Sequence, residues 1–283
     1  MSKPQENALV GPPSGGDAES AAPSGQAYFS EEALRGIPWM VANKVLMLFV
    51  YMAISVLTVR LLGPVEYGRF VLVRSIAEYL VVVCALGLDV ALLRFVPELV
   101  STRNKAGLVR LVWRTFALQQ ATALVAIGTL LLAEPWLEKG FDMRFDGLLL
   151  PAGLLLAATV FKDAVNNLLT ALFRTRTVAL LSFANGLSWL FLLVGVLRFH
   201  PAASAALTVQ VASLFVVYAI GMALVARLLR AMHWRSPPLG IGRQRTLRLS
   251  LPVMLNTLLR MMMLKYTEIF FLGVYFTPAI VGY

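Results

Sequence analysis

Ionisable residues inside apolar stretches are the residues of this chain that could do chemistry. Arg74 and Glu78 stand four residues apart, so a helix places both on one face. With about 100° of rotation per residue, Asp89 falls within roughly 60° of them. A charge near the middle of a spanning helix costs about 2.5–3.5 kcal/mol, so it usually faces a cavity or a partner. Two interpretations of this face stay open: a cavity wall or a self-neutralising ion pair. For Asp89, which follows Gly87 near a helix end, the structural role is favoured.

A second polar face is predicted near the end of the chain. Within residues 249–276, Arg260 and Asn256 share one helical face with Thr267, and no acid lies on it. Arg260 must therefore find a partner on another element or be solvated in a cavity, and the cavity is favoured. Lys44 stands in the first apolar stretch, about two turns from its end, so its ammonium can also reach the headgroup layer.

Polar residues recur in a third place, where they indicate helix packing. They are Asp163, Asn167, Thr170 and Arg174 at i, i+4, i+7 and i+11, with Lys162 and Asn166 beside them and Asn185 in the next apolar stretch. Buried amides and hydroxyls hold membrane helices together more often than they bind ligands. We expect these residues to join helices.

The composition defines the kind of chain that must position these residues. Of 283 residues, 59% are hydrophobic and 14% are charged, and the mean hydropathy is +0.75. Soluble domains have about 45–50% apolar and about 25% charged residues, which makes this a membrane protein. Basic loops explain the net charge of +10 in such a chain, so no nucleic-acid partner is expected.

Motifs for common catalytic and metal sites are missing from the sequence. It contains no P-loop and no H-E-x-x-H motif, and its two histidines, His200 and His233, stand in predicted loops. The single cysteine, Cys84, lies in an apolar run and cannot form an internal disulfide. We therefore expect no metal, no cofactor and no enzymatic activity.

Seven stretches have the roughly 20 apolar residues that a membrane-spanning helix needs. They are residues 38–61, 70–93, 112–133, 147–172, 178–198, 205–227 and 249–276, joined by short connections. The predicted fold class is an all-α integral membrane protein, a polytopic helical bundle. It has one six-helix lobe (37–230), a basic loop (231–248) and the first helix of a second lobe (249–283). Residues 1–35 are predicted to be a disordered cytoplasmic tail with a short interfacial helix at 29–36.

The charge of the connections predicts the orientation in the membrane. Residues 94–114, 172–178 and 227–248 are basic, whereas residues 133–146 are net acidic. Basic loops remain on the cytoplasmic side. The N-terminus and the three basic connections are therefore predicted to be cytoplasmic.

A short motif between the first two spans recurs at the end of the chain. "LLGPVEYGRF" at 61–70 is echoed by "LGVYFTPAIVGY" at 272–283, with an even number of spans between them. Such spacing indicates a parallel repeat, and we expect the chain to stop where a second lobe has begun. In the first copy, Gly63 is predicted to end a helix in a left-handed cap and Glu66 to lie near the positive end of the next turn. A structural turn is favoured over a ligand site.

The same segments resemble the polysaccharide-biosynthesis flippases of the Wzx type, in the multidrug/oligosaccharidyl-lipid/polysaccharide exporter superfamily. The resemblance is carried by "LLGPVEYGRF", "LGLDVALLRFVPE" and "LSLPVMLNTLL", and it covers about residues 38–283. It implies two six-helix lobes around a cavity that is typically cationic. It also implies transfer of undecaprenyl-pyrophosphate-linked oligosaccharides from the cytoplasmic to the outer leaflet of the bacterial inner membrane, by alternating access. The implied partners are the lipid-linked oligosaccharide, membrane lipid and the polysaccharide polymerase machinery.

Particular residues match these expectations by type. The candidate substrate-binding residues are Arg260, Arg74, Lys44 and Asn256, and the candidates for coupling to a proton or sodium ion are Glu78 and Asp89. Two alternatives remain. A cation-coupled multidrug antiporter of the same fold should have a less basic cavity. A membrane polysaccharide polymerase or ligase usually carries a large external loop, whereas residues 133–146 are few.

Overall fold

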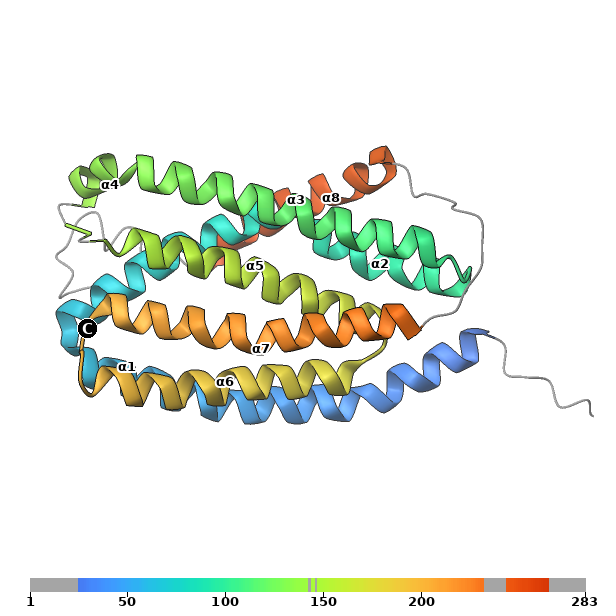
Figure 1. Cartoon of the computed structure of the whole chain (residues 1–283), viewed down its shortest axis with the longest axis horizontal. Helices are drawn as coiled ribbons and strands as arrows, with labels where there is room; N and C mark the ends of the chain where they lie inside the picture. The colour runs from blue at the N-terminus through green and yellow to red at the C-terminus, as the bar shows by residue number, and fades with distance from the viewer. Residues whose placement is uncertain (1–24, 142–143, 146, 232–242, 265–283) are drawn as a thin grey trace, which may run out of the picture.

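The computed structural model describes residues 25–141, 144–145, 147–231 and 243–264, and every regular element in these ranges is helical. The all-α class predicted from the sequence is confirmed (Figure 1). By length and composition, five helical stretches can cross a membrane: Pro38–Ala85, Lys105–Leu132, Leu149–Ala171, Thr175–Leu197 and Ala203–Ala231. The chain is therefore a polytopic membrane protein.

The first stretch provides two crossings because helix α1 (Gly25–Ala85) is folded back on itself. At Gly63 the backbone has φ 71° and ψ 171°, a conformation that is essentially restricted to glycine. In Figure 1, α1 runs to one end of the bundle and returns from it. Each arm exceeds the roughly 20 residues that a span needs. The predicted hairpin is confirmed, although Gly63 adopts an extended positive-φ conformation rather than the left-handed cap.

The N-terminal part of α1 differs from the sequence prediction. Residues 29–36 are not a separate short helix, since α1 begins at Gly25 and continues through Gly36 and Pro38. A proline in a helix interior removes one backbone hydrogen bond and does not by itself end the helix. The predicted stop at this point is therefore wrong.

A second break follows the returning arm. Leu86 and Gly87 have φ values of 51° and 64°, and helix α2 (Leu88–Ser101) begins after them. A Cβ atom on Gly87 would collide with the backbone of Ser250 in helix α8 (Arg243–Leu264). Glycine here therefore lets α8 pack against the junction of α1 and α2. Because the helix is interrupted, Asp89 does not continue the face of Arg74 and Glu78, and the shared face predicted from helical periodicity is wrong.

Helix α5 (Leu149–Ala171) lies at the centre of the bundle, where it packs against α1, α2, α3 and α7. Its neighbours are α3 (Lys105–Leu132), α6 (Thr175–Leu197) and α7 (Ala203–Ala231), and the short α4 (Glu134–Phe141) follows α3. Two arms of α1 together with α3, α5, α6 and α7 make the six-helix lobe. The span predicted at 249–276 begins in α8, and the part after residue 264 lies outside the described ranges.

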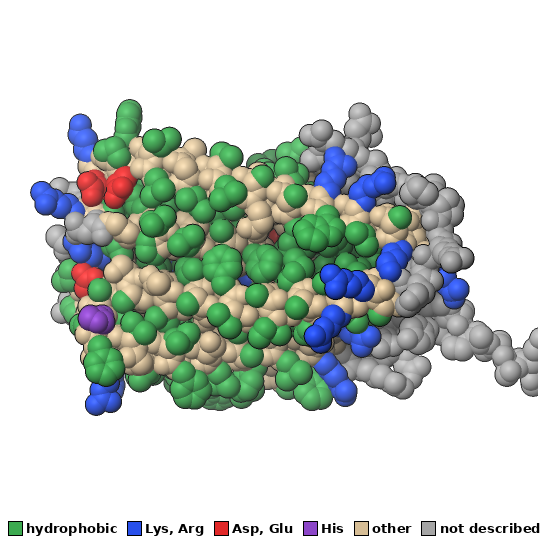
Figure 2. All heavy atoms as spheres, in the orientation of Figure 1, with side chains coloured by type: hydrophobic (Ala, Val, Ile, Leu, Met, Phe, Trp, Pro, Cys, Tyr) green, Lys and Arg blue, Asp and Glu red, His purple; other side chains and the backbone are tan. Residues whose placement is uncertain are grey.

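On the face shown in Figure 2, most charged side chains lie at the two ends of the bundle. In Figure 2, Lys and Arg side chains gather at one end, whereas the opposite end carries both acidic and basic side chains. The connections α2–α3 and α5–α6 and the end of α7 lie at the first end in Figure 1. The described parts of the connections predicted to share one side of the membrane therefore share one end of the molecule, and residues 232–242 lie outside the described ranges.

Candidate functional site

A polar cavity of about 350 Å³ lies among four helices of the lobe. The residues that line it are Tyr51, Arg74, Glu78 and Val81 of α1, Thr159, Lys162, Asp163 and Asn166 of α5, Ser182, Asn185 and Trp189 of α6, and Gln210, Leu214 and Tyr218 of α7. Eleven of these fourteen side chains carry a charge, hydroxyl or amide, if the indole is left aside. Such a lining inside a membrane-spanning bundle indicates a wet site.

A second cavity of about 340 Å³ adjoins the first along α1. The two share Tyr51, Arg74, Glu78 and Trp189, and the second adds the hydroxyl groups of residues such as Ser55. We call the two cavities together the polar groove. Because α1 contributes to it before and after Gly63, the hairpin at that glycine is what brings Tyr51 opposite Arg74.

Arg74 is the best-fixed cation of the polar groove. Its Nε donates a 2.9 Å hydrogen bond to Glu78 Oε1, and its guanidinium lies 5.5 Å from the Trp189 ring and 5.9 Å from the Phe70 ring. Tyr51 packs edge-to-face on Trp189 at 6.3 Å. Aromatic faces attract a cation and restrain the guanidinium plane. Both sequence interpretations of Arg74 and Glu78 therefore apply, since the pair is an ion pair and also lines a cavity.

A second ion pair comes from α5. Lys162 Nζ lies 3.1 Å from Asp163 Oδ1, and the adjacent Asn166 donates from Nδ2 to the Tyr218 hydroxyl at 3.1 Å. The ion pair lies within α5, and the bond from Asn166 to Tyr218 joins α5 to α7 across the groove. The packing role predicted for the 162–174 stripe is thus correct for Asn166, yet the same residues form the wall of the cavity.

Three buried polar atoms of the groove wall have no hydrogen-bond partner among the described residues. They are Asn166 Oδ1, Trp189 Nε1 and Gln210 Oε1. An unpaired buried polar atom costs about 1–3 kcal/mol. Since these groups line a cavity, water or a polar ligand can pair with them there. The groove therefore offers both hydrogen-bond donors and acceptors to a polar ligand.

The six candidate site residues predicted from the sequence lie in different parts of the structure. Arg74 and Glu78 lie in the polar groove. Lys44, Asn256 and Arg260 are exposed and line neither cavity, while Thr267 lies outside the described residues. The role of each in substrate binding remains a prediction.

Asp89 belongs to a different contact. Gln119 of α3 donates from Nε2 to Asp89 Oδ1 at 3.0 Å and to the Ala85 carbonyl at 3.2 Å. The bond to Ala85 pairs a backbone carbonyl at the break between α1 and α2 with the Gln119 side chain. The structural role favoured for Asp89 fits this geometry, because the contact fixes the break against α3.

Sequence reasoning left Lys162, Asp163, Gln210 and Tyr218 out of the site. The signal for the first two was present, since charged residues near a span centre usually face a cavity or a partner. Gln210 and Tyr218 stand eight residues apart and share the groove face of α7. Only the packing of α7 against α5 shows that this face is inside the lobe.

The charges of the polar groove cancel. Its charged side chains are Arg74, Lys162, Glu78 and Asp163, two of each sign. The cavity implied by the sequence resemblance is cationic, so the described groove departs from it. Arg74 and Lys162 each lie beside their acid, and a ligand meets two ion pairs rather than a uniform positive field.

No protein-family profile, curated protein or solved structure matches this chain. Fold and groove together define an all-α polytopic membrane protein with a polar site inside its helical lobe. Among the residues that the structure describes, no cluster of His, Cys, Asp and Glu could hold a metal ion.

Proposed function

We propose that this chain forms a helical lobe of a bacterial inner-membrane transporter. It flips undecaprenyl-pyrophosphate-linked oligosaccharide from the cytoplasmic to the outer leaflet and leaves the substrate chemically unchanged. The observation that carries the proposal is the polar groove, which holds Arg74 and Lys162 within helices long and apolar enough to span a membrane. The sequence resemblance to Wzx-type flippases supports the same activity.

The groove offers the interactions that such a headgroup requires. A pyrophosphate that crosses hydrocarbon needs compensating charge, and the planar guanidinium provides five donors. The bond to Glu78 uses Nε of Arg74, and no hydrogen bond from the two terminal nitrogens is present in the described part of the chain. In the proposed mechanism these nitrogens bind phosphate oxygens, while Phe70 and Trp189 hold the guanidinium in place. Rocking of the lobe then exposes the groove to the other leaflet.

The orientation follows from the distribution of charge. The basic end of the bundle carries the connections α2–α3 and α5–α6 (Figures 1 and 2). Positive residues favour the cytoplasmic side. We therefore assign this end, and with it the start of α1, to the cytoplasm.

Reconstituted protein tests the activity directly. Proteoliposomes would receive a fluorescent undecaprenyl-pyrophosphate saccharide, and a membrane-impermeant quencher would measure its transfer between leaflets. We expect transfer above that of protein-free vesicles. R74Q should lower it about tenfold or more, since a hydrogen bond to a charged group contributes about 1.5–3 kcal/mol.

A matched variant controls for the loss of an Arg–aromatic contact. Arg176 lies 4.8 Å from the Trp39 ring and does not line the groove. R176Q removes the same charge and the same kind of contact, so it should retain transfer near the unmodified level. Equal transfer by R74Q and the unmodified protein would remove Arg74 from the site, and no protein-dependent transfer would refute the flippase.

A cation-coupled multidrug antiporter is the second candidate, and the cancelled charge of the groove favours it. A groove with Glu78 and Asp163 beside its cations can bind a cationic ligand as well as an anionic one. The same vesicles, given an imposed proton or sodium gradient, distinguish the two. Gradient-driven movement of ethidium that is abolished in E78Q, without movement of the saccharide lipid, would establish the antiporter instead.

A further inference from the structure

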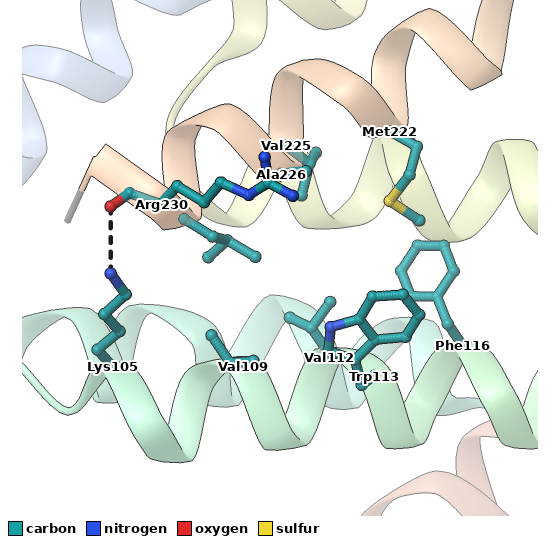
Figure 3. Close-up of a pocket in the computed structure, with 10 residues that line it drawn as sticks. Lys105, Val109, Val112, Trp113, Phe116, Met222, Val225, Ala226 and Arg230 are labelled. Atoms are coloured by element: carbon teal, nitrogen blue, oxygen red, sulfur yellow. Dashed lines mark hydrogen bonds between the residues drawn. The ribbon is translucent and has the colours of Figure 1, made fainter.

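An apolar cleft of about 280 Å³ lies between α3 and α7, both of which pack on α5 (Figure 3). Its walls are Val109, Val112, Trp113 and Phe116 of α3 and Met222, Val225, Ala226 and Leu229 of α7. In Figure 3, Lys105 and Arg230 lie together at one end of the cleft, and Phe116 and Met222 lie at the other. No residue of this cleft lines the polar groove, so it is a separate feature.

The length of the cleft matches one leaflet of a membrane. Lys105 and Phe116 are eleven residues apart on α3, which corresponds to about 16 Å at a rise of about 1.5 Å per residue. Half of a hydrocarbon core is about 15 Å thick. The cleft thus extends from the basic end of the bundle, where headgroups lie, to about the middle of the bilayer.

The two charged residues that line the cleft, Lys105 and Arg230, are both basic and stand where α3 begins and α7 ends. Lys105 Nζ donates to the backbone carbonyl of Arg230 at 3.2 Å, which holds the ammonium beside the last turn of α7. The Arg230 side chain is exposed and, in Figure 3, its guanidinium extends along α7 toward Ala226. No acidic residue lines the cleft. Deeper in, the wall is apolar, with Trp113 67% exposed. A ligand that fits has a negative head and a hydrocarbon tail.

We propose that this cleft binds an anionic diacyl phospholipid of the surrounding membrane. Its phosphate contacts Lys105 and Arg230, and one acyl chain lies along the cleft between α3 and α7. The volume is near the lower end for small-molecule sites, which are about 300–1,000 Å³, and so suits a single chain. No polar side chain lines the cleft below its mouth to recognise a sugar, which favours bulk phospholipid over the lipid-linked oligosaccharide. The proposal does not depend on the function proposed above.

Native mass spectrometry of the purified intact chain tests the site. The chain would be titrated with phosphatidylglycerol and, separately, with phosphatidylcholine. We expect tighter binding of phosphatidylglycerol. K105Q/R230Q should weaken it about 25-fold, because each basic residue near a lipid surface contributes about 1 kcal/mol, or about fivefold.

Two further variants separate a site from general attraction. R110Q/R114Q removes two exposed charges of the same helix that do not line the cleft, so it should change binding less than threefold. A226F keeps every charge but fills the cleft, and it should weaken both phospholipids. It also preserves the test if K105Q/R230Q fails to fold.

Three results would overturn the proposal. One is equal weakening by R110Q/R114Q and K105Q/R230Q, and another is unchanged binding in A226F. The third is displacement of phosphatidylglycerol by undecaprenyl phosphate at a lower concentration than phosphatidylglycerol itself needs. That last result would make the cleft a substrate site. Saccharide transfer in vesicles of phosphatidylcholine alone would show separately whether the proposed function stands.

Discussion

Replacing Arg74 tests whether the polar groove is held in shape by its own side chains. R74Q removes the guanidinium but keeps a long polar side chain. It breaks the 2.9 Å bond to Glu78 and both aromatic contacts, to Phe70 and Trp189. It also leaves the Glu78 carboxylate without its partner inside the helical lobe. R74K keeps the charge but loses the planar donor, so it should have an intermediate effect.

The magnitude can be worked from these contacts. A hydrogen bond between charged groups contributes about 1.5–3 kcal/mol when buried. The two side chains remain 35% and 23% exposed, so solvent screening reduces this to about 1–1.5 kcal/mol. Each aromatic contact adds about 0.5–1 kcal/mol. R74Q should therefore lower the free energy of unfolding by about 2–3.5 kcal/mol, and the coupling between Arg74 and Glu78 should be about 1–1.5 kcal/mol.

The single cysteine provides the assay. Cys84 is 2% exposed and packs against Thr122 of α3, so a maleimide reacts with it when the lobe opens. Equilibrium unfolding in mixed micelles, followed by Cys84 labelling, would be measured for R74Q, E78Q and R74Q/E78Q. The double-mutant cycle isolates the pair, because removing both partners avoids an unpaired charge.

Arg176 provides the matched comparison, because its guanidinium lies over one aromatic ring and it does not line the groove. R176Q should cost about 0.5–1 kcal/mol. If R74Q costs no more than R176Q, and if the cycle gives additive effects, then Arg74 is not fixed by its neighbours. The preorganised cation of the proposed mechanism would then be refuted.

Two further predictions concern the ends of helices. Glu66 Oε2 accepts a 2.9 Å bond from the backbone N–H of Ala203, the first residue of α7. E66A should lower the free energy of unfolding, measured by Cys84 labelling, by about 0.5–2 kcal/mol, and E66Q should lower it by less. A larger loss in E66Q than in E66A would contradict a capping role. G63A should cost about 1–3 kcal/mol from backbone strain, although no atom lies within 4 Å of the added Cβ. G128A, where the added Cβ also meets open space but the backbone is helical, should be neutral or stabilising, and equal effects of the two would disprove the strain.

Six of the seven predicted spans coincide with apolar helical stretches of the described residues, since apolar length is a strong signal, and the seventh stays a prediction. The turn at 61–70 was equally clear, since Gly followed by Pro interrupts two apolar runs. Its second role was not visible, because the bond from Glu66 to α7 joins residues 137 positions apart. The break at Leu86 was missed for a different reason. Leucine rarely adopts a positive φ, so the residue type at position 86 gave no signal of the break.

The site was only half predictable. Helical periodicity found Arg74 and Glu78, because both belong to one helix. It could not show that α5 supplies Lys162 and Asp163 to the same cavity, since that depends on which face of α5 meets α1 and α7. Lys44 and Arg260 were selected by their charge and by their position within apolar stretches, and the structure places both at exposed positions. Charge type identifies candidates, and packing decides which of them face one another.

The pairing of charges in the groove bears on how a transporter of this kind could release its substrate. A lone arginine in a low-dielectric site would hold a pyrophosphate too strongly to let it leave. Glu78 Oε1 already accepts a 2.9 Å bond from Nε of Arg74, so its negative charge offsets part of the attraction of the guanidinium for a phosphate at the terminal nitrogens. Asp163 stands in the same relation to Lys162. The cancelled charge is thus compatible with transport of an anion, and it predicts that E78Q binds the saccharide lipid more tightly than the unmodified protein while transferring it more slowly. Weaker binding in E78Q would show that the carboxylate positions Arg74 rather than competing for it.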